Sequence, residues 1–199
     1  MSRLVTFGCS HTYGMGLEDP SKEAWPHVLG KLLGKEKVVN KGNTGASIKE
    51  ITHTAFNFKF LPTDTEVILW THLNRYCITG KERCIRINPW FVDKDSLSDY
   101  YYKNIHTEYD DMFQSRSFIL STEYFIREKV DSLYHAFSDG KVLNLLSHHL
   151  KSKNYHKKHF TRLLKYGLAL DNSHLGAKAN EIFAKEVCDF INEKDKNLV

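Results

Sequence analysis

Short apolar runs alternate with segments of helical spacing in the first third of the chain. Residues 4–7, 38–40 and 66–70 are mainly apolar runs that stop at a glycine or a polar turn, which predicts buried strands. Residues 24–33 and 47–55 lie between them and repeat their apolar positions every three or four residues, which predicts helices. The order strand, helix, strand, helix, strand is typical of a parallel sheet covered by helices.

Both predicted helices carry signals at their ends. Pro26 is compatible only with the first turn of the first helix, and Gly34 ends that helix. Ser47 is a suitable N-cap for the second helix, and Glu50, three residues later, completes a capping box.

The second half of the chain has a less regular pattern. No clean period is present between Cys77 and Tyr102, where aromatic residues are dense. We therefore expect one domain, residues 1–199, with an aromatic-rich insertion or lid around 76–140. The further elements expected are a long helix between 116 and 137, a fourth strand at 142–146, a helix at 159–165 and a final helix at 177–192.

The composition is that of a globular chain. The 199 residues are 41% hydrophobic and 26% charged and include 4 prolines, which argues against intrinsic disorder. No apolar run approaches the roughly 18 residues that a membrane span needs, and the start is too soon interrupted to be a signal peptide. Four cysteines do not suggest a disulfide scaffold, so we expect a cytoplasmic protein.

Positive charge concentrates in one segment. The formal net charge is +4, and residues 141–165 contain seven Lys and Arg residues but no Asp or Glu. Such a segment is either a solvated surface or a site for an anion. With Tyr155 and Phe160 it leaves a nucleic-acid-binding module as the weaker, non-enzymatic alternative, whose affinity should fall steeply with salt.

Three polar loops directly follow the predicted parallel strands, at residues 8–16, 41–47 and 71–75. Ligands of open α/β sheets bind outside the carboxyl ends of the strands, so these loops should converge. The first loop offers Cys9 and Ser10 as nucleophiles, and a serine hydroxyl needs a nearby base to take its proton.

Other polar positions supply the groups that an activated serine needs. Gly42 and Gly45 let backbone N–H groups approach a developing oxyanion, and Asn74 can donate a side-chain N–H to it. Asp171 precedes His174 by three residues, so the carboxylate can hold one ring nitrogen while the other faces a nucleophile. Taken alone, Asp171 could be a residue at the start of a helix, and His174 could be a surface histidine. Their order along the chain is what indicates a site.

Four segments in this order resemble the sequence blocks of the SGNH or GDSL hydrolases. Residues 7–10, Phe-Gly-Cys-Ser, are similar to the family's strand that ends in Gly-Asp-Ser, and residues 40–45 contain an Asn with a Gly five residues later. Residues 70–75 represent the Gly-x-Asn-Asp block loosely, and Asp-x-x-His recurs at 171–174. The resemblance implies a three-layer α/β/α sandwich with a mostly parallel, flavodoxin-like central sheet of about five strands.

The resemblance also implies a chemistry. Ser10 would be the nucleophile, His174 the general base and then acid, and Asp171 its orienting carboxylate. The backbone N–H groups of Ser10 and Gly45 and the side chain of Asn74 would hold the oxyanion. The implied reaction is hydrolysis of a small-molecule, carbohydrate or lipid ester, or a thioester, through an acyl-enzyme, without a metal or cofactor. The sequence leaves the oligomeric state open.

Two departures from the family's blocks bear on this interpretation. Cys9 stands where the family has an Asp beside the nucleophile. The third block lacks its Gly and its final Asp, and Arg75 occupies that last position, so Thr71 or His72 could take the role of Asn74. A relative that has lost activity and become a binding or structural protein is therefore a second alternative.

Two rival sites can also be drawn from the sequence. Cys9 needs less activation than a serine, but neighbouring side chains diverge, so only one of Cys9 and Ser10 can face the histidine. A metal site is the other rival, and zinc sites usually recruit Cys or carboxylate at firmer spacing than these histidines have. The histidines concerned are His148, His149, His156 and His159.

Overall fold

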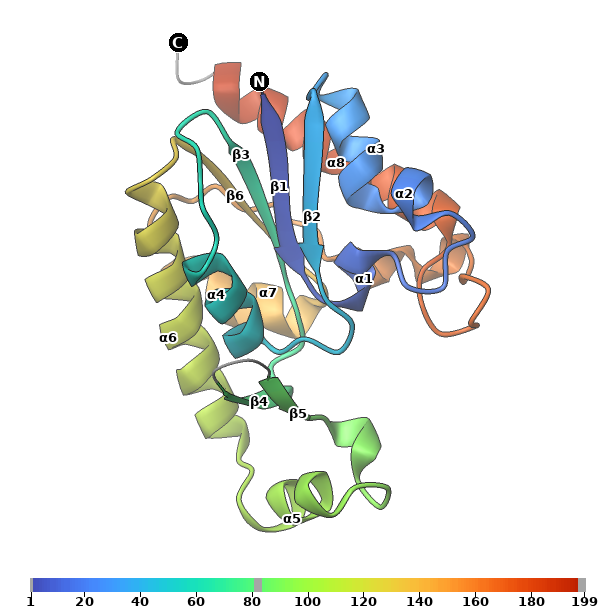
Figure 1. Ribbon diagram of the computed structural model, residues 1–199, viewed down its shortest axis with the longest axis vertical. Helices are drawn as coiled ribbons and strands as arrows, with labels where there is room; N and C mark the ends of the chain where they lie inside the picture. Colours follow the sequence, from blue (N-terminus) through green and yellow to red (C-terminus); the bar gives the residue numbers. More distant parts are fainter. Residues whose placement is uncertain (1, 81–83, 197–199) are drawn as a thin grey trace.

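Four parallel strands form the sheet at the centre of the structure (Figure 1). The computed structural model describes residues 2–80 and 84–196. The strands, in spatial order, are β2 (Lys37–Gly42), β1 (Arg3–Gly8), β3 (Thr65–Trp70) and β6 (Ser132–Phe137). This order, with the first strand between the second and the third, is flavodoxin-like. The predicted α/β class is confirmed, with four strands where about five were expected.

The strands reach the same edge of the sheet at their carboxyl ends. Gly8 pairs with Gly42 across β1 and β2, and Trp70 pairs with Phe137 across β3 and β6. The loops that follow β1, β2 and β3 therefore begin side by side, as the order of elements predicts.

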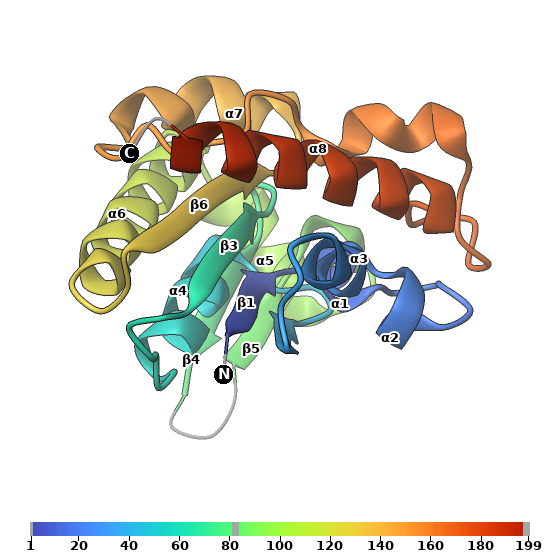
Figure 2. The same ribbon diagram turned by 90° about the horizontal axis from the view of Figure 1, so that it is seen from above.

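Helices cover both faces of the sheet (Figure 2). One face carries α3 (Trp25–Leu32) and α8 (Ala177–Lys196), and the other carries α4 (Ile48–Phe56) and α6 (Glu108–Arg127). Alternate side chains of β1 point to the two layers, Leu4 to the first and Val5 and Phe7 to the second. Strands buried on both faces appear as continuous apolar runs, which is why the sequence shows them so clearly.

The remaining elements lie mostly beyond the ends of the strands. A short helix, α1 (Ser10–Tyr13), follows β1, and a hairpin, β4 (Tyr76–Thr79) with β5 (Cys84–Ile87), follows β3. Figure 1 shows the hairpin and α5 (Ser96–Asn104) below the carboxyl ends of the sheet. The other elements are α2 (Pro20–Glu23), α7 (Gly140–Leu146) and the 3-10 helices Pro89–Phe91, Ser147–His149 and Phe160–Tyr166.

The predicted strand at 142–146 is wrong, because these residues belong to α7. The side chain of Asp139 caps that helix by accepting the Val142 N–H at 2.9 Å. Val142 and Leu146, four residues apart, are both buried, which is the spacing of one helix face. The fourth strand is β6 instead. Its apolar pattern is interrupted by Tyr134 and His135, which are polar in type but buried.

Three other features differ from those expected. The long helix α6 occupies 108–127, because Thr107 caps its start and three acidic residues fill its first turn. The helix expected at 159–165 is the 3-10 helix at 160–166. Ser47 does accept the Glu50 N–H at 3.2 Å, but the Glu50 carboxylate turns to other partners instead of closing the capping box.

The insertion expected around 76–140 contains the hairpin, α5, α6 and β6, and its residues 81–83 lie outside the described part. Within the described residues, none of the helices combines the length and the apolar character that crossing a membrane requires.

Candidate active site

A pocket of about 420 Å³ opens at the carboxyl edge of the sheet. Ser10, Gly45 and His174 all line this pocket, although they lie in three separate parts of the sequence. The structure therefore brings together three of the residues that the sequence indicates. The segment that follows β3 contributes further lining residues, namely Arg75, Arg86, Asn88, Trp90 and Phe91.

Ser10 begins α1 immediately after β1 and is only 4% exposed. The neighbouring Cys9 is fully buried in the apolar cluster beneath α4 and α6, and it does not line the pocket. The two adjacent side chains thus diverge, as expected from their positions. The geometry favours Ser10 over Cys9 as the nucleophile.

Asp171 and His174 form a closed turn. One carboxylate oxygen of Asp171 accepts the backbone N–H groups of Ser173 at 3.0 Å and His174 at 2.9 Å, and the other lies 2.6 Å from Nδ1 of His174. The backbone hydrogen bond from His174, followed by that from Ser173, lowers the pKa of Asp171 to about 2. Asp171 is therefore ionised at neutral pH. Its carboxylate can hold the His174 ring through Nδ1, which leaves Nε2 available for another partner.

Gly16 fits this turn against the loop that follows α1. Its carbonyl accepts the Leu170 N–H at 2.9 Å, and its φ of +80° is unfavourable for residues with a side chain. A Cβ at Gly16 would lie 2.6 Å from the Asp171 carboxyl carbon. The absence of a side chain at Gly16 thus lets the acidic residue approach.

His11 packs beside the candidate base, with its ring centroid 5.4 Å from that of His174. Burial, together with the nearby His174, His72 and Arg75, lowers the pKa of His11 to about 3. His11 is therefore neutral at physiological pH. It can pack against the candidate base without adding a positive charge beside it.

No hydrogen bond joins Ser10 to His174 within residues 2–80 and 84–196. Asp171 occupies Nδ1 of His174, so Nε2 is the ring atom that can take a proton from a nucleophile. Hydrogen bonds between a nucleophile and its base are often long in unliganded enzymes and tighten when substrate binds.

Asn40 ties the loop after β2 to α1. Its side-chain oxygen accepts the Gly42 N–H at 2.9 Å, and its amide donates to the Thr12 carbonyl at 2.7 Å. A Cβ at Gly42 would lie 2.3 Å from the backbone nitrogen of Tyr13, so only glycine permits this approach. Gly45, with φ +71°, follows in the same loop and reaches the pocket.

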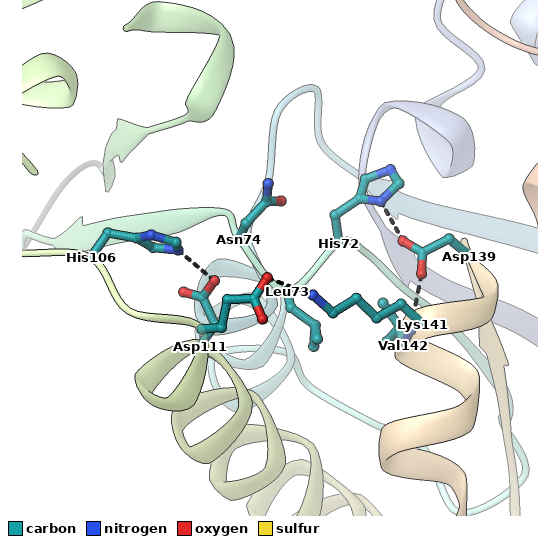
Figure 3. A pocket seen from close by; sticks show the side chains of 9 residues that line it. His72, Leu73, Asn74, His106, Asp111, Asp139, Lys141 and Val142 are labelled. Atoms are coloured by element: carbon teal, nitrogen blue, oxygen red, sulfur yellow. Dashed lines mark hydrogen bonds and ion pairs between the residues drawn. The ribbon is translucent and has the colours of Figure 1, made fainter. Parts of the chain in front are cut away.

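Asn74 does not join Ser10 and Gly45. It is exposed and lines a second pocket, of about 280 Å³, together with His72. Figure 3 shows this second pocket, in which His72 points toward Asp139 and hydrogen-bonds to it. The side chain of His72 thus lies outside the pocket of Ser10 as well.

Asn88, which the sequence did not indicate, lines the pocket near Gly45. It is 1% exposed, and neither its side-chain nitrogen nor its oxygen has a hydrogen-bond partner within the described residues. Its Nδ2 atom is 3.6 Å from the position that a Cβ on Gly45 would occupy. A buried amide without partners is costly. A polar group of a ligand bound in this pocket would supply the hydrogen-bond partner that the Asn88 amide lacks within the described residues.

Glu50 anchors the segment that carries Asn88. Its carboxylate receives two hydrogen bonds from Arg86, at 2.9 and 2.6 Å, and one from the Asn43 side chain at 3.0 Å. Arg86 lies on β5, two residues before Asn88, whereas Glu50 lies on α4 and Asn43 in the loop after β2. These bonds fix the hairpin against that loop.

The histidines of the rival metal site do not gather. His156 packs its ring against Phe183, with the centroids 5.9 Å apart, and its Nδ1 lies 2.9 Å from the Lys158 carbonyl. Among the described residues, the ligand atoms that do cluster belong to Glu50, Cys77 and Cys84, within 4.8 Å of one another. Burial raises the pKa of the Cys77 thiol to about 11, and Arg86 already neutralises Glu50. This cluster is therefore poorly prepared for a metal ion.

Residues of the basic segment 141–165 are partly engaged with other side chains. Arg162 and Lys158 both pair with Glu186, and Lys141 pairs with Glu108 at 3.1 Å. Such pairing favours a structural role for these cations over a surface that binds nucleic acid.

Comparisons with known proteins support the fold. No protein-family model and no curated protein sequence matches this chain. A catalytic mutant of an acetylxylan esterase from Geobacillus stearothermophilus is 15% identical, with 95% of this chain and 93% of that chain covered and a TM-score of 0.60. A lipase/acylhydrolase from Enterococcus faecalis is 15% identical, with 98% and 97% covered and a TM-score of 0.58.

A member of the lipolytic protein G-D-S-L family from Veillonella parvula is 12% identical, with 95% of this chain and 97% of that chain covered and a TM-score of 0.56. This chain therefore has the fold of G-D-S-L esterases and lipases, as its motifs imply.

Substitution of Gly16 should disturb the turn of Asp171 and His174. Gly34→Ala is the matched control, because Gly34 also has positive φ but has no atom within 4 Å of an added Cβ. We expect Gly34→Ala to cost about 1–2 kcal/mol of backbone strain. Gly16→Ala should cost at least about 1 kcal/mol more, because Asp171 must also move. Urea unfolding measures both, and equal losses would contradict the contact.

Replacement of Asp171 should have a pH-dependent effect on stability. The folded-state pKa of Asp171, about 2, lies below its ordinary value of 3.8. Its contribution is therefore fully present above pH 3.8 and is lost as pH falls through 2. We expect Asp171→Asn to destabilise the protein at neutral pH and to approach wild-type stability near pH 2. Urea unfolding across pH tests this, with Asp189→Asn on α8 as control, and a constant difference would refute it.

Proposed function

We propose that the protein is a serine hydrolase that cleaves an ester or thioester through an acyl-enzyme on Ser10. The observation that carries this proposal is the meeting of Ser10, Gly45 and His174 in one pocket, with Nδ1 of His174 held by Asp171. The fold shared with esterases and lipases supports the same reaction class.

The residues divide the chemistry between them. Oγ of Ser10 attacks the carbonyl carbon of the ester while Nε2 of His174 takes the hydroxyl proton, and Asp171 stabilises the resulting imidazolium. His174 then returns the proton to the leaving alcohol or thiol, and the acyl group remains on Ser10. Water, deprotonated by His174, attacks this acyl-enzyme, which releases the acid and restores the serine.

The negative charge on the carbonyl oxygen needs hydrogen-bond donors. In this proposal the backbone N–H groups of Ser10 and Gly45 supply two, and the side chain of Asn88 supplies the third in place of Asn74. The burial of Asn88, its unpartnered amide and its proximity to Gly45 support this assignment. Donors fixed in advance in a site shielded from water stabilise such a charge strongly.

A reactive-serine assay tests the nucleophile. We expect a fluorophosphonate to label Ser10, and a short-chain 4-nitrophenyl ester to be hydrolysed. Ser10→Ala and His174→Ala should lower turnover by about a thousandfold or more. Cys9→Ala is the control, and it should retain activity because that side chain faces the core.

Turnover that survives Ser10→Ala would refute the mechanism. No labelling and no turnover on any ester would favour the non-catalytic binding or structural protein. Steeply salt-dependent binding of an oligonucleotide would favour the nucleic-acid-binding alternative.

Comparison of two asparagine variants tests the third oxyanion donor. Asn88→Ala should lower kcat by about 10²–10³, the loss expected for one donor of an oxyanion hole. Asn74→Ala should change kcat little. Because the Asn88 amide has no partner within the described residues, its removal should not lower the free energy of unfolding. Equal activity of the two variants would exclude Asn88 from this role.

A further inference from the structure

The pocket of Ser10 is lined by two arginines and, among the described residues, by no carboxylate. Arg86 is neutralised by Glu50. Arg75, by contrast, forms no ion pair within residues 2–80 and 84–196. The pocket that Ser10 lines thus contains one arginine that has no acidic partner in the described part of the chain.

Arg75 is positioned by contacts that leave most of its donors unused. Its Cζ atom lies over the Trp90 ring, 4.8 Å from the ring centroid, which is a cation–π contact. One terminal nitrogen donates to the Ala46 carbonyl at 3.4 Å, directly beside Gly45. The Nε atom is buried and has no partner in the described part. A guanidinium has five N–H donors, and their fork matches the two oxygens of a carboxylate.

We propose that Arg75, backed by Trp90, forms a subsite for a carboxylate on the substrate, so that the esters cleaved are those of anionic molecules. This inference rests on the proposed hydrolase function. The carboxylate would accept hydrogen bonds from Arg75 while the scissile carbonyl lies between Ser10 and Gly45. Trp90 and Phe91 would contact the apolar part that links the two groups.

The placement of the charge supports selectivity for anions. The cation is held by an aromatic ring and a backbone carbonyl, neither of which cancels its charge. A cleft lined by one sign of charge concentrates ligands of the opposite sign. A neutral ester that fills the same volume would leave the guanidinium donors without a charged acceptor.

Matched pairs of esters test the subsite on each side of the scissile bond. The first pair is 4-acetoxybenzoate and its methyl ester, which carry or lack the anion on the alcohol side. The second is the 4-nitrophenyl monoester of adipic acid and its methyl ester, which differ on the acyl side. We expect wild-type protein to prefer the anionic member of at least one pair, and the pair that shows the preference identifies the side.

The variants assign this preference to Arg75. Arg75→Gln should lower the ratio of kcat/KM for anionic over neutral ester by roughly 10- to 100-fold, the loss of a charged hydrogen bond. Arg75→Lys should keep a substantial part of the ratio, and Lys178→Gln, on the surface of α8, should keep all of it. A wild-type protein without preference in either pair, or an unchanged ratio in Arg75→Gln, would overturn the subsite.

Binding without turnover separates this inference from the proposed function. Titration calorimetry of each of the two anionic esters into Ser10→Ala should show binding of at least one, and Ser10→Ala/Arg75→Gln should weaken that binding by a similar factor. If the anion binds and no ester is cleaved by wild-type protein, the subsite stands and the hydrolase does not. If esters are cleaved without regard to charge, the hydrolase stands and the subsite does not. If Arg75→Gln fails to fold, the subsite is tested by the preference of wild-type protein for anionic esters and by the part of that preference that Arg75→Lys keeps.

Discussion

The ion pair between Glu50 and Arg86 determines where the inserted hairpin lies, and the wall of the pocket depends on it. Burying two charges costs free energy, so this pair is best understood as a positioning device rather than as a source of net stability. Its bidentate geometry, with Asn43 as a further donor, fixes β5 against α4 and the loop after β2. Asn88 and Trp90 follow β5 closely, so the same contact helps to place an amide and an aromatic ring in the wall of the pocket that Ser10 lines.

A second constraint acts on the segments that carry Ser10, Gly45 and His174, where backbone approaches its neighbours more closely than side chains allow. Gly42 lies against the backbone of α1, and Gly16 lies against the Asp171 carboxylate. These approaches draw three loops, from the start, the first third and the end of the chain, to one edge of the sheet. The arrangement needs no long-range ion pair, because the register of β1 with β2 and the position of α8 already bring the loops near one another.

These two parts of the site differ in how far the sequence predicts them. The strands at 4–7 and 38–40 stand out as short apolar runs, so the loops after them, with Ser10 and Gly45, are predicted to lie at one edge of the sheet. The strand β6 was missed because buried Tyr134 and His135 interrupt its pattern, and its tertiary environment rather than its composition makes it a strand. Asn88 was missed for a related reason: its position follows from a contact between residues 50 and 86, which no local pattern reveals.

This division has a consequence for how such a site can change. Ser10, at the start of α1, and the turn of Asp171 and His174 lie outside the segment that follows β3, whereas Arg75, Asn88 and Trp90 lie on that segment. Substitutions in that segment can alter the charge and shape of the pocket while the turn of Asp171 and His174 keeps its hydrogen bonds. The proposed substrate preference and the proposed proton transfer between Ser10 and His174 therefore depend on different parts of the chain. Asn88 is the exception. It lies on the segment after β3, which lines the pocket, and in our proposal its side chain also donates a hydrogen bond to the oxyanion.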